Sequence, residues 1–237
     1  MNYFKIIPIF IFTSLCYSQS EVNYYNIIDS VSELRIENDI KKLVSFGTRH
    51  TLSDTLSNSN GIGAARRWIK KSFTEISKNC DNCLEVSYQK NYFKKNKRRL
   101  VKDVWINNVI AIQRGKTNPN RFIIMSGDID SRVSDSNDFK SLSPGANDNA
   151  SGMAGVIEAA RVLSKYKFDN SIIYVGLSGE EQGLYGGAGL AKYAKEQNWE
   201  IIGVLNNDMI GNIEGVDGII DNVSFRIFSE PTPANES

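Results

Sequence analysis

The sequence predicts an α/β protein in which a mainly parallel, mixed sheet carries helices on both faces. From Arg121 onward, short apolar runs alternate with amphipathic helical segments, a pattern that is typical of parallel strands joined by crossover helices. Acidic residues follow these apolar runs. Because α/β proteins bind their ligands at the carboxyl ends of the strands, we expect the functional groups at that edge of the sheet.

Length and composition fit one folded domain without a strongly charged surface. The chain has 237 residues, of which 41% are hydrophobic, and a formal net charge of +1, so it can bury one full core. Nucleic acids and membrane surfaces attract proteins with a net basic field. The balanced charge therefore argues against both as partners, and it leaves the oligomeric state undetermined.

The amino terminus has the features of an export signal. A short apolar stretch, Ile6–Leu15, follows a lysine and precedes small and polar residues. Its length is typical of a signal-peptide core and is too short to span a bilayer. We expect residues 1–18 to be removed, residues 19–237 to form the folded domain, and the protein to be secreted or periplasmic. Lipid attachment at Cys16 is the alternative, which the bulky Leu15 disfavours.

Two cysteines lie close together in the segment KNCDNC. In an oxidising compartment Cys80 and Cys83 are expected to form a local disulfide. A zinc site would need further thiols or imidazoles, and His50 is the single histidine. A redox pair would need a helix start to lower the pKa of a thiol.

The amino-terminal half predicts two helices and a hairpin. Apolar residues recur at helical spacing in residues 31–46 and 64–76, and residues 84–93 and 103–115 have strand composition. The basic stretch from Lys94 to Arg99 joins the two strands. We expect its charges to be solvated, because no aromatic residues alternate with them as a nucleic-acid surface would require.

The carboxyl-terminal half predicts a βαβαβ unit. After it, the segment from Val216 to Ser237 contains one more plausible strand and no closing helix. The five predicted elements, in order, are strand 121–127, helix 151–166, strand 170–179, helix 184–197 and strand 200–211.

Six acidic residues follow the apolar runs or begin the helix between them. Carboxylates that gather at neighbouring strand ends repel each other strongly, so they ionise together only around a cation or by sharing protons. The pattern therefore predicts a metal site. Its candidate residues are Asp128, Asp130, Asp148, Glu180, Glu181 and Asp208.

Each of these acids alone has an ordinary structural explanation. Asp148 could cap a helix, Asp208 could be a turn residue, and the adjacent Glu180 and Glu181 could be solvated. The glutamate pair, however, lies between glycines with no obvious basic partner. Adjacent side chains there point in different directions, so one can bind a metal while the other activates water, as hydrolytic metal sites require.

Several motifs together resemble the zinc aminopeptidases of the M28 family, over about residues 30–230. The resemblance implies an exported two-zinc exopeptidase with the zinc-exopeptidase α/β fold that acts on the free amino termini of peptides. The motifs are RFIIMSGDIDSR, SPGANDNASGMAGVIEAARVL, YVGLSGEEQGLYGG and GVLNNDMIGN, with FGTRHT near the start.

The resemblance also implies a role for most of the acids. Asp148 would bridge both zinc ions, Glu181 would bind one of them and Asp208 the other, and Glu180 would be the general base. The peptide bond between Asp148 and Asn149 would be cis.

Two departures from the family pattern concern the metal ligands. Asp128 stands where the family has a histidine, and Asp130 matches the aspartate that orients this histidine. Aspartate can bind zinc, but its charge weakens the Lewis acid and favours manganese or cobalt. No histidine follows Asp208 to supply the family's last ligand, and His50 lies in the wrong motif. We therefore expect the natural protein to continue beyond Ser237.

The residues favour a metal-dependent aminopeptidase acting on peptide substrates. Glu180 would take a proton from a metal-held water and deliver it to the leaving amine. Two alternatives stay open. One is a catalytically incomplete relative that binds peptides or metal without turnover, and the other is a glutaminyl cyclase with a single zinc. The preferred amino-terminal residue depends on loops that the sequence does not place.

Overall fold

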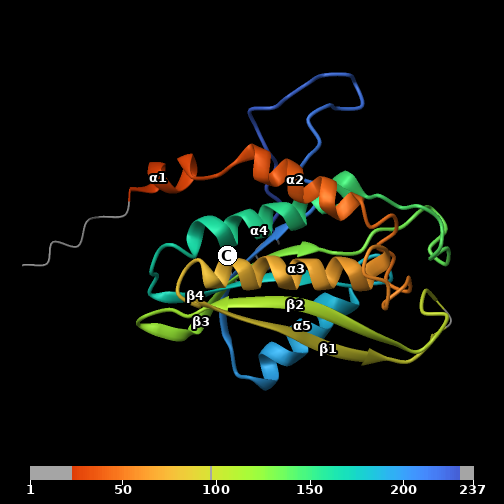
Figure 1. Cartoon of the computed structure of the whole chain (residues 1–237), viewed down its shortest axis with the longest axis horizontal. Coiled ribbons are helices and arrows are strands. Elements are labelled where there is room, and N and C mark those ends of the chain that lie inside the picture. The colour runs from red at the N-terminus through yellow and green to blue at the C-terminus, as the bar shows by residue number, and fades with distance from the viewer. Residues whose placement is uncertain (1–22, 97, 230–237) are drawn as a thin grey trace, which may run out of the picture.

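The five strands of the predicted α/β sheet are present, with helices on both faces (Figure 1). The computed structural model describes residues 23–96 and 98–229, so the predicted signal peptide lies outside the described residues. The strand order is β1-β2-β4-β3-β5. The strands are β1 Leu84–Phe93, β2 Val104–Gln113, β3 Asn118–Asp128, β4 Asn170–Leu177 and β5 Glu200–Asn207.

The strand directions confirm a mixed, mainly parallel sheet. Strand β2 pairs antiparallel with β1 and with β4. Strand β3 pairs parallel with both β4 and β5. Among the described strands, β2 is thus the one that runs against the others. The carboxyl ends of β3, β4 and β5 consequently meet at one edge, where the sequence places its acidic residues.

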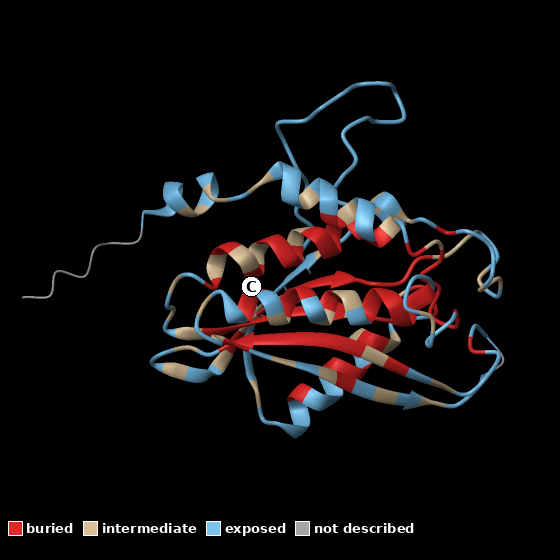
Figure 2. Ribbon diagram, in the orientation of Figure 1, coloured by how far each residue is buried: buried red, intermediate tan, exposed pale blue. Residues whose placement is uncertain are grey.

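Two helices cover one face of the sheet and one helix covers the other. Helices α3 (Gly61–Lys78) and α4 (Gly152–Leu163) bury apolar side chains such as Phe73 and Ile157 against one face. Helix α5 (Tyr185–Glu196) covers the opposite face through Leu190. Figure 2 shows the buried strands between these layers. The short irregular turn η1 (Ala146–Ser151) leads into α4.

Helix α2 (Glu33–Val44) lies against α4, and the short helix α1 (Tyr24–Asp29) precedes it. Ser32 begins α2 because its hydroxyl accepts the Arg35 N–H at 3.3 Å, satisfying one of the free donors of the first turn. Glu33 in the first turn and Lys41 in the last turn complement the helix dipole. The helix predicted over residues 31–46 therefore forms with slightly narrower bounds.

A buried carboxylate joins α2 to α4. The side chain of Glu158 is 2% exposed and accepts the Ser32 N–H at 2.9 Å and the Arg35 Nε at 2.9 Å. Arg161 Nη1 lies 3.1 Å from Glu158 Oε2 and also pairs with Asp39 at 2.6 Å. Burial alone would raise the pKa of Glu158, but these donors outweigh it and hold the pKa below its usual value. The carboxylate therefore favours the folded state when ionised.

We predict that Glu158→Gln lowers the unfolding free energy by about 2 kcal/mol at neutral pH, because two arginines lose their buried acceptor. Since the folded pKa is depressed, the contribution is complete above the unfolded pKa, about 4.3, and disappears as the pH falls through the folded pKa. Urea unfolding at pH 7 and at pH 3 measures this difference. Glu37→Gln, which removes an exposed pair with Lys41, should change stability by less than about 0.5 kcal/mol. An equal effect of both substitutions would contradict the prediction.

The predicted disulfide is confirmed, because the structure joins Cys80 and Cys83 with an S–S distance of 2.05 Å. The bond follows the carboxyl end of α3 and precedes β1. Helix α3 ends at Lys78, before the cysteines, and neither cysteine begins a described helix, as a redox pair would require.

The expectation of a further strand after Val216 is wrong for the described residues. Through residue 229 this segment has one isolated bridge, between Glu214 and Ile220, and Phe225 and Phe228 are 83% and 87% exposed. The composition suits a strand, but in the described part of the chain no neighbour pairs with it. No described helix is both long enough and apolar enough to span a membrane.

Candidate metal centre

Three neighbouring strands deliver the predicted acids to one edge of the sheet. Asp128 ends β3, Glu180 and Glu181 follow β4, and Asp208 follows β5. Because β3 pairs parallel with both other strands, these three ends are adjacent. Asp148 reaches the same edge from η1, the turn that leads into α4.

Asp128 is a buried acid of this cluster with a strongly raised pKa. It is 5% exposed. Burial, together with the charges of Asp130, Glu180 and Asp208, raises the pKa of Asp128 to about 8. The three neighbours act on Asp128 because the fold has brought them close to it. At pH 7 and without a cation, most Asp128 side chains are therefore protonated.

Glu180 and Asp208 at this edge also have raised pKa values. Burial and four neighbouring carboxylates raise the pKa of Glu180 to about 7. Partial burial and the charge of Asp148 raise the pKa of Asp208. Asp148 and Asp208 remain accessible to solvent. The strand ends thus bring these carboxylates close enough together to act on one another electrostatically.

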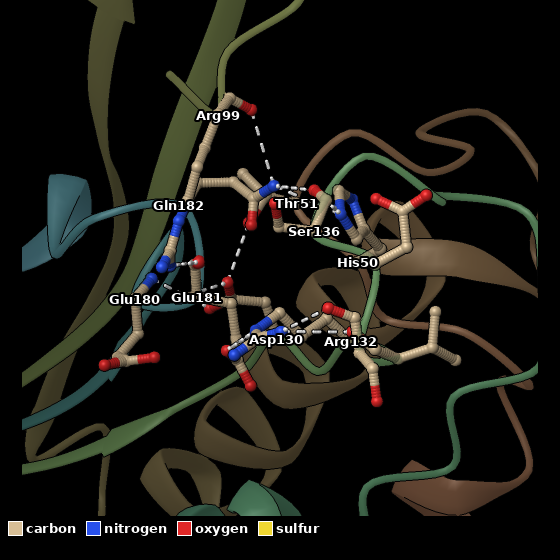
Figure 3. Close-up of polar contacts among 12 residues, drawn as sticks. His50, Thr51, Arg99, Asp130, Arg132, Ser136, Glu180, Glu181 and Gln182 are labelled. Carbon is tan, nitrogen blue, oxygen red and sulfur yellow. Dashed lines mark hydrogen bonds and ion pairs between the residues drawn. The ribbon is translucent and has the colours of Figure 1, made fainter.

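Asp130 holds the loop that carries the two glutamates (Figure 3). Its carboxylate accepts the Thr51 hydroxyl at 2.7 Å and the backbone N–H of Gly179 at 2.8 Å. It also accepts the N–H groups of Glu180 and Glu181, each at 3.2 Å. Burial raises the pKa of Asp130, and these donors oppose the rise. The residue that was expected to orient a metal ligand therefore positions the glutamate loop.

Glu181 has two basic partners that the sequence did not suggest (Figure 3). Arg132 Nε lies 2.5 Å from its carboxylate. Arg99 Nη1 donates to its backbone carbonyl at 2.6 Å. The expectation that the glutamate pair lacks a basic partner is therefore wrong for Glu181. The described residues of the stretch Lys94 to Arg99 are exposed, as expected, and Arg99 in addition contacts the Glu181 loop. Both contacts join residues far apart in sequence, so only the folded chain brings them together.

Asn149 ties the turn of Asp148 to the ends of two strands. It is 1% exposed, and its Nδ2 donates to Asp128 at 3.2 Å and to the Asn207 carbonyl at 2.9 Å. Its Oδ1 accepts the N–H of Gly152 at 3.0 Å. The predicted cis peptide bond between Asp148 and Asn149 is present. The side chain of Asn149 was not among the predicted site residues.

Gly152 allows α4 to start directly against β5. A Cβ atom on Gly152 would lie 2.0 Å from the Asn207 carbonyl oxygen. We predict that Gly152→Ala lowers stability by about 2 kcal/mol, because the helix start must move away from β5. Gly187 in α5 is a matched control, since a Cβ there meets nothing within 4 Å. Gly187→Ala should raise the free energy of unfolding by as much as about 1 kcal/mol. Thermal unfolding of both variants tests this, and equal stabilities would contradict it.

Arg49 is a second residue that the sequence analysis missed. Its side chain is fully buried and donates to the carbonyls of Leu43, Ile129, Pro144 and Gly145 at 3.2, 2.8, 2.5 and 2.9 Å. Burial lowers the pKa of Arg49 to about 10, and nearby acids counteract it. One guanidinium therefore fixes both the Asp128 loop and the turn before Asp148. The FGTRHT motif, which contains Arg49, was the feature of the sequence that could have identified this residue.

His50 is occupied by structural hydrogen bonds, in line with its rejection as a ligand (Figure 3). The Leu52 N–H donates to its Nδ1 at 3.0 Å, so Nε2 carries the proton and faces the Ser136 carbonyl at 3.1 Å. Burial lowers the pKa of His50. Gln182 Nε2 donates to the same carbonyl at 2.7 Å, which anchors the residue after Glu181.

The donor set of this edge suits a divalent cation. Carboxylate oxygens bind zinc and the harder divalent ions, and a cation would relieve the repulsion that raises the pKa values of Asp128 and Glu180. Among residues 23–96 and 98–229, no three acidic, histidine or cysteine side chains stand close enough to hold one ion. Glu181 must also exchange its Arg132 contact for the cation. The residues therefore fit a cation by charge and donor type, although their side chains are not close enough together in this structure to hold one ion.

The fold and the site define an α/β protein with a cluster of carboxylates at the carboxyl edge of its sheet. The chain belongs to peptidase family M28, whose model matches residues 108–224. A probable zinc metalloprotease of Leptosphaeria maculans is 41% identical over 211 residues, which are 89% of this chain and 49% of that protein. The chain spans about half the length of the curated relatives it matches.

Solved structures with low sequence identity share the fold. Legionella pneumophila LapB superposes with a TM-score of 0.64 at 18% identity, over 83% of this chain and 48% of that one. An aminopeptidase from Aneurinibacillus sp. strain AM-1 gives 0.60 at 16% identity, over 80% and 73%. A Fimbriiglobus ruber glutaminyl cyclase gives 0.58 at 18% identity, over 74% and 61%. These structures confirm the predicted zinc-exopeptidase fold.

Proposed function

We propose that the protein is a zinc-dependent aminopeptidase that removes residues from the free amino terminus of peptides. The coupled acids at the carboxyl edge of the sheet carry this proposal. Membership of family M28 and relatives described as probable zinc metalloproteases support it. The similar fold of an aminopeptidase supports the exopeptidase specificity. Export to the periplasm or the medium is part of the proposal.

Four acids would hold the cations. Asp148 would lie between two zinc ions, Glu181 and Asp208 would each bind one, and Asp128 would occupy the position of the family's histidine. Bound zinc supplies an acidified water and a polarised scissile carbonyl. The carboxylate at position 128 adds negative charge, so manganese or cobalt should support activity comparatively well.

Glu180 is placed to move the proton. Its backbone N–H is held by Asp130 at 3.2 Å, and its half-buried side chain lies among the other acids. The carboxylate would take the proton from the attacking water and deliver it to the leaving amine nitrogen. The backbone anchor keeps the base in place, and Arg99 holds the backbone carbonyl of the neighbouring Glu181.

Metal content and peptide specificity test the proposal together. We expect zinc to copurify with the protein and aminoacyl p-nitroanilides to be hydrolysed, with activity lost on chelation and restored by zinc. The N-acetylated forms of the same substrates should not be cleaved, because the free amino terminus is required. Equal cleavage of both forms would indicate an endopeptidase. A protein that binds zinc without hydrolysing either would be the catalytically incomplete relative.

A glutaminyl cyclase is the second candidate, because enzymes of that activity share the fold at TM-scores of 0.58 and 0.61. Cyclisation releases ammonia and keeps the peptide length, whereas hydrolysis shortens the peptide. Incubation with a glutaminyl peptide, followed by mass spectrometry, separates these products. Pyroglutamate formation without release of the first residue would replace the aminopeptidase proposal.

A further inference from the structure

A pocket lies between the start of α3 and the β1–β2 hairpin. Its volume is about 560 Å³, within the range of sites for small organic molecules. Thr51, which also binds Asp130, contributes to its wall, but none of the six clustered acids does. Residues 51–53 and 55, the first turns of α3 and the beginning of β2 supply most of the lining.

Arg66 brings a buried positive charge to the wall of this pocket. The residue is 6% exposed, and its guanidinium makes no hydrogen bond or ion pair with any described residue. Burial lowers the pKa of Arg66 to about 10. Buried arginines are normally paired because an unpaired charge loses its hydration without replacement. Arg66 lines the pocket, so its guanidinium can donate to a ligand bound there.

The other charged residues of the pocket leave it positive. Arg67 Nη1 donates to the Thr55 carbonyl at 2.8 Å, and Lys102 Nζ donates to the Leu52 carbonyl at 3.3 Å. Neither is paired with a carboxylate among the described residues. Asp103 is the single acid of the lining, and its oxygens accept the Tyr92 hydroxyl at 2.7 Å and the Lys95 N–H at 2.8 Å. The pocket is thus complementary to an anion.

Part of the lining is apolar. Trp105 is 56% exposed, and it lines the pocket with Tyr88, Val104 and Leu52. An exposed tryptophan beside aromatic and aliphatic side chains offers a surface for a ring or a hydrocarbon group. A free inorganic anion would use the arginine and leave this surface uncovered.

We propose that this pocket binds a small organic acid, with its carboxylate on Arg66 and its apolar group against Trp105. A guanidinium binds a carboxylate through two parallel N–H···O bonds, which gives the ligand a defined orientation. The pocket is a binding site in addition to the cation centre, and the proposal does not depend on peptidase activity.

Calorimetry with N-benzoylglycine and its amide tests the proposal, because the two compounds differ only in the charged group. The protein is first freed of metal with a chelator and then of the chelator by gel filtration, so that the carboxylate cannot bind at the cation centre. We expect N-benzoylglycine to bind and the amide to bind at least about tenfold more weakly. Equal binding of the two would overturn the proposal, as would inorganic phosphate that binds more tightly than N-benzoylglycine.

Three variants locate the binding. Arg66→Gln should weaken N-benzoylglycine about tenfold or more, and Arg66→Lys should bind with intermediate affinity because it keeps the charge without the fork. Arg98→Gln removes an exposed charge of the hairpin tip outside the lining and should bind as the parent does. Thermal unfolding identifies a misfolded variant, and Arg66→Gln should unfold no lower than the parent. A folded Arg66→Gln protein with unchanged affinity would exclude Arg66 as the anchor.

Discussion

Replacement of Glu180 by glutamine is expected to lower kcat for an aminoacyl p-nitroanilide by about 10²–10⁴-fold, while the zinc content per chain stays the same. The magnitude is typical of the loss of a general base. Glu180 is the acid whose backbone is held by Asp130 and whose side chain has no basic partner among the described residues. Its neighbour Glu181 is instead paired with Arg132, and a metal ion bound by Glu181 would take the place of this guanidinium.

The control for this experiment is Glu196→Gln, which removes an exposed carboxylate paired with Lys192 in α5 and should retain activity. Zinc content is measured on each variant by mass spectrometry. If Glu180→Gln keeps full activity with zinc bound, Glu180 is not the base. If it loses zinc as well as activity, Glu180 acts as a ligand.

Replacement of Arg49 by methionine is expected to lower the unfolding free energy by about 3–5 kcal/mol, because four buried carbonyls lose their donor at once. These carbonyls come from Leu43, Ile129, Pro144 and Gly145. Three of them flank Asp128 or precede Asp148 by a few residues, so the affinity for zinc should fall as well. Urea unfolding and zinc titration measure the two effects.

Arg67→Met is the matched comparison, since Arg67 also donates to backbone carbonyls but is exposed. Water replaces an exposed donor at little cost, and we expect a loss below about 1 kcal/mol. Similar losses for the two variants would show that burial of the Arg49 guanidinium is not the cause. A stability loss on replacement of Arg49 without any change in zinc affinity would show that Arg49 stabilises the fold but does not position the metal ligands.

Local sequence patterns predicted the elements well where the elements pack on the sheet. The helices over residues 31–46, 151–166 and 184–197 and the hairpin strands all form near their expected bounds. In these segments propensity and the apolar pattern agree with the tertiary contacts. Strand composition failed after Val216, because a strand also needs a partner to pair with.

For the candidate site, too, the local pattern predicted one part of the arrangement and tertiary contacts decided the rest. The sequence placed Asp128, Glu180 and Asp208 at strand ends, and parallel pairing of β3 with β4 and β5 makes those ends neighbours. Most of the supporting contacts were not predictable, because they join residues far apart in sequence. Asp130 and Glu181 are 51 positions apart, and Arg49 and Gly145 are 96 positions apart. No periodicity or spacing encodes such pairs.

By itself, therefore, the sequence determined the α/β class, the order of the elements, the disulfide and the acids that follow each strand, because all of these depend on local pattern and chemistry. Only the tertiary structure decided which groups orient those acids. Arg49, Asn149 and Arg132 act through contacts that exist once the sheet has formed. The position of the Arg66 guanidinium in the wall of a pocket likewise became visible only in the folded chain.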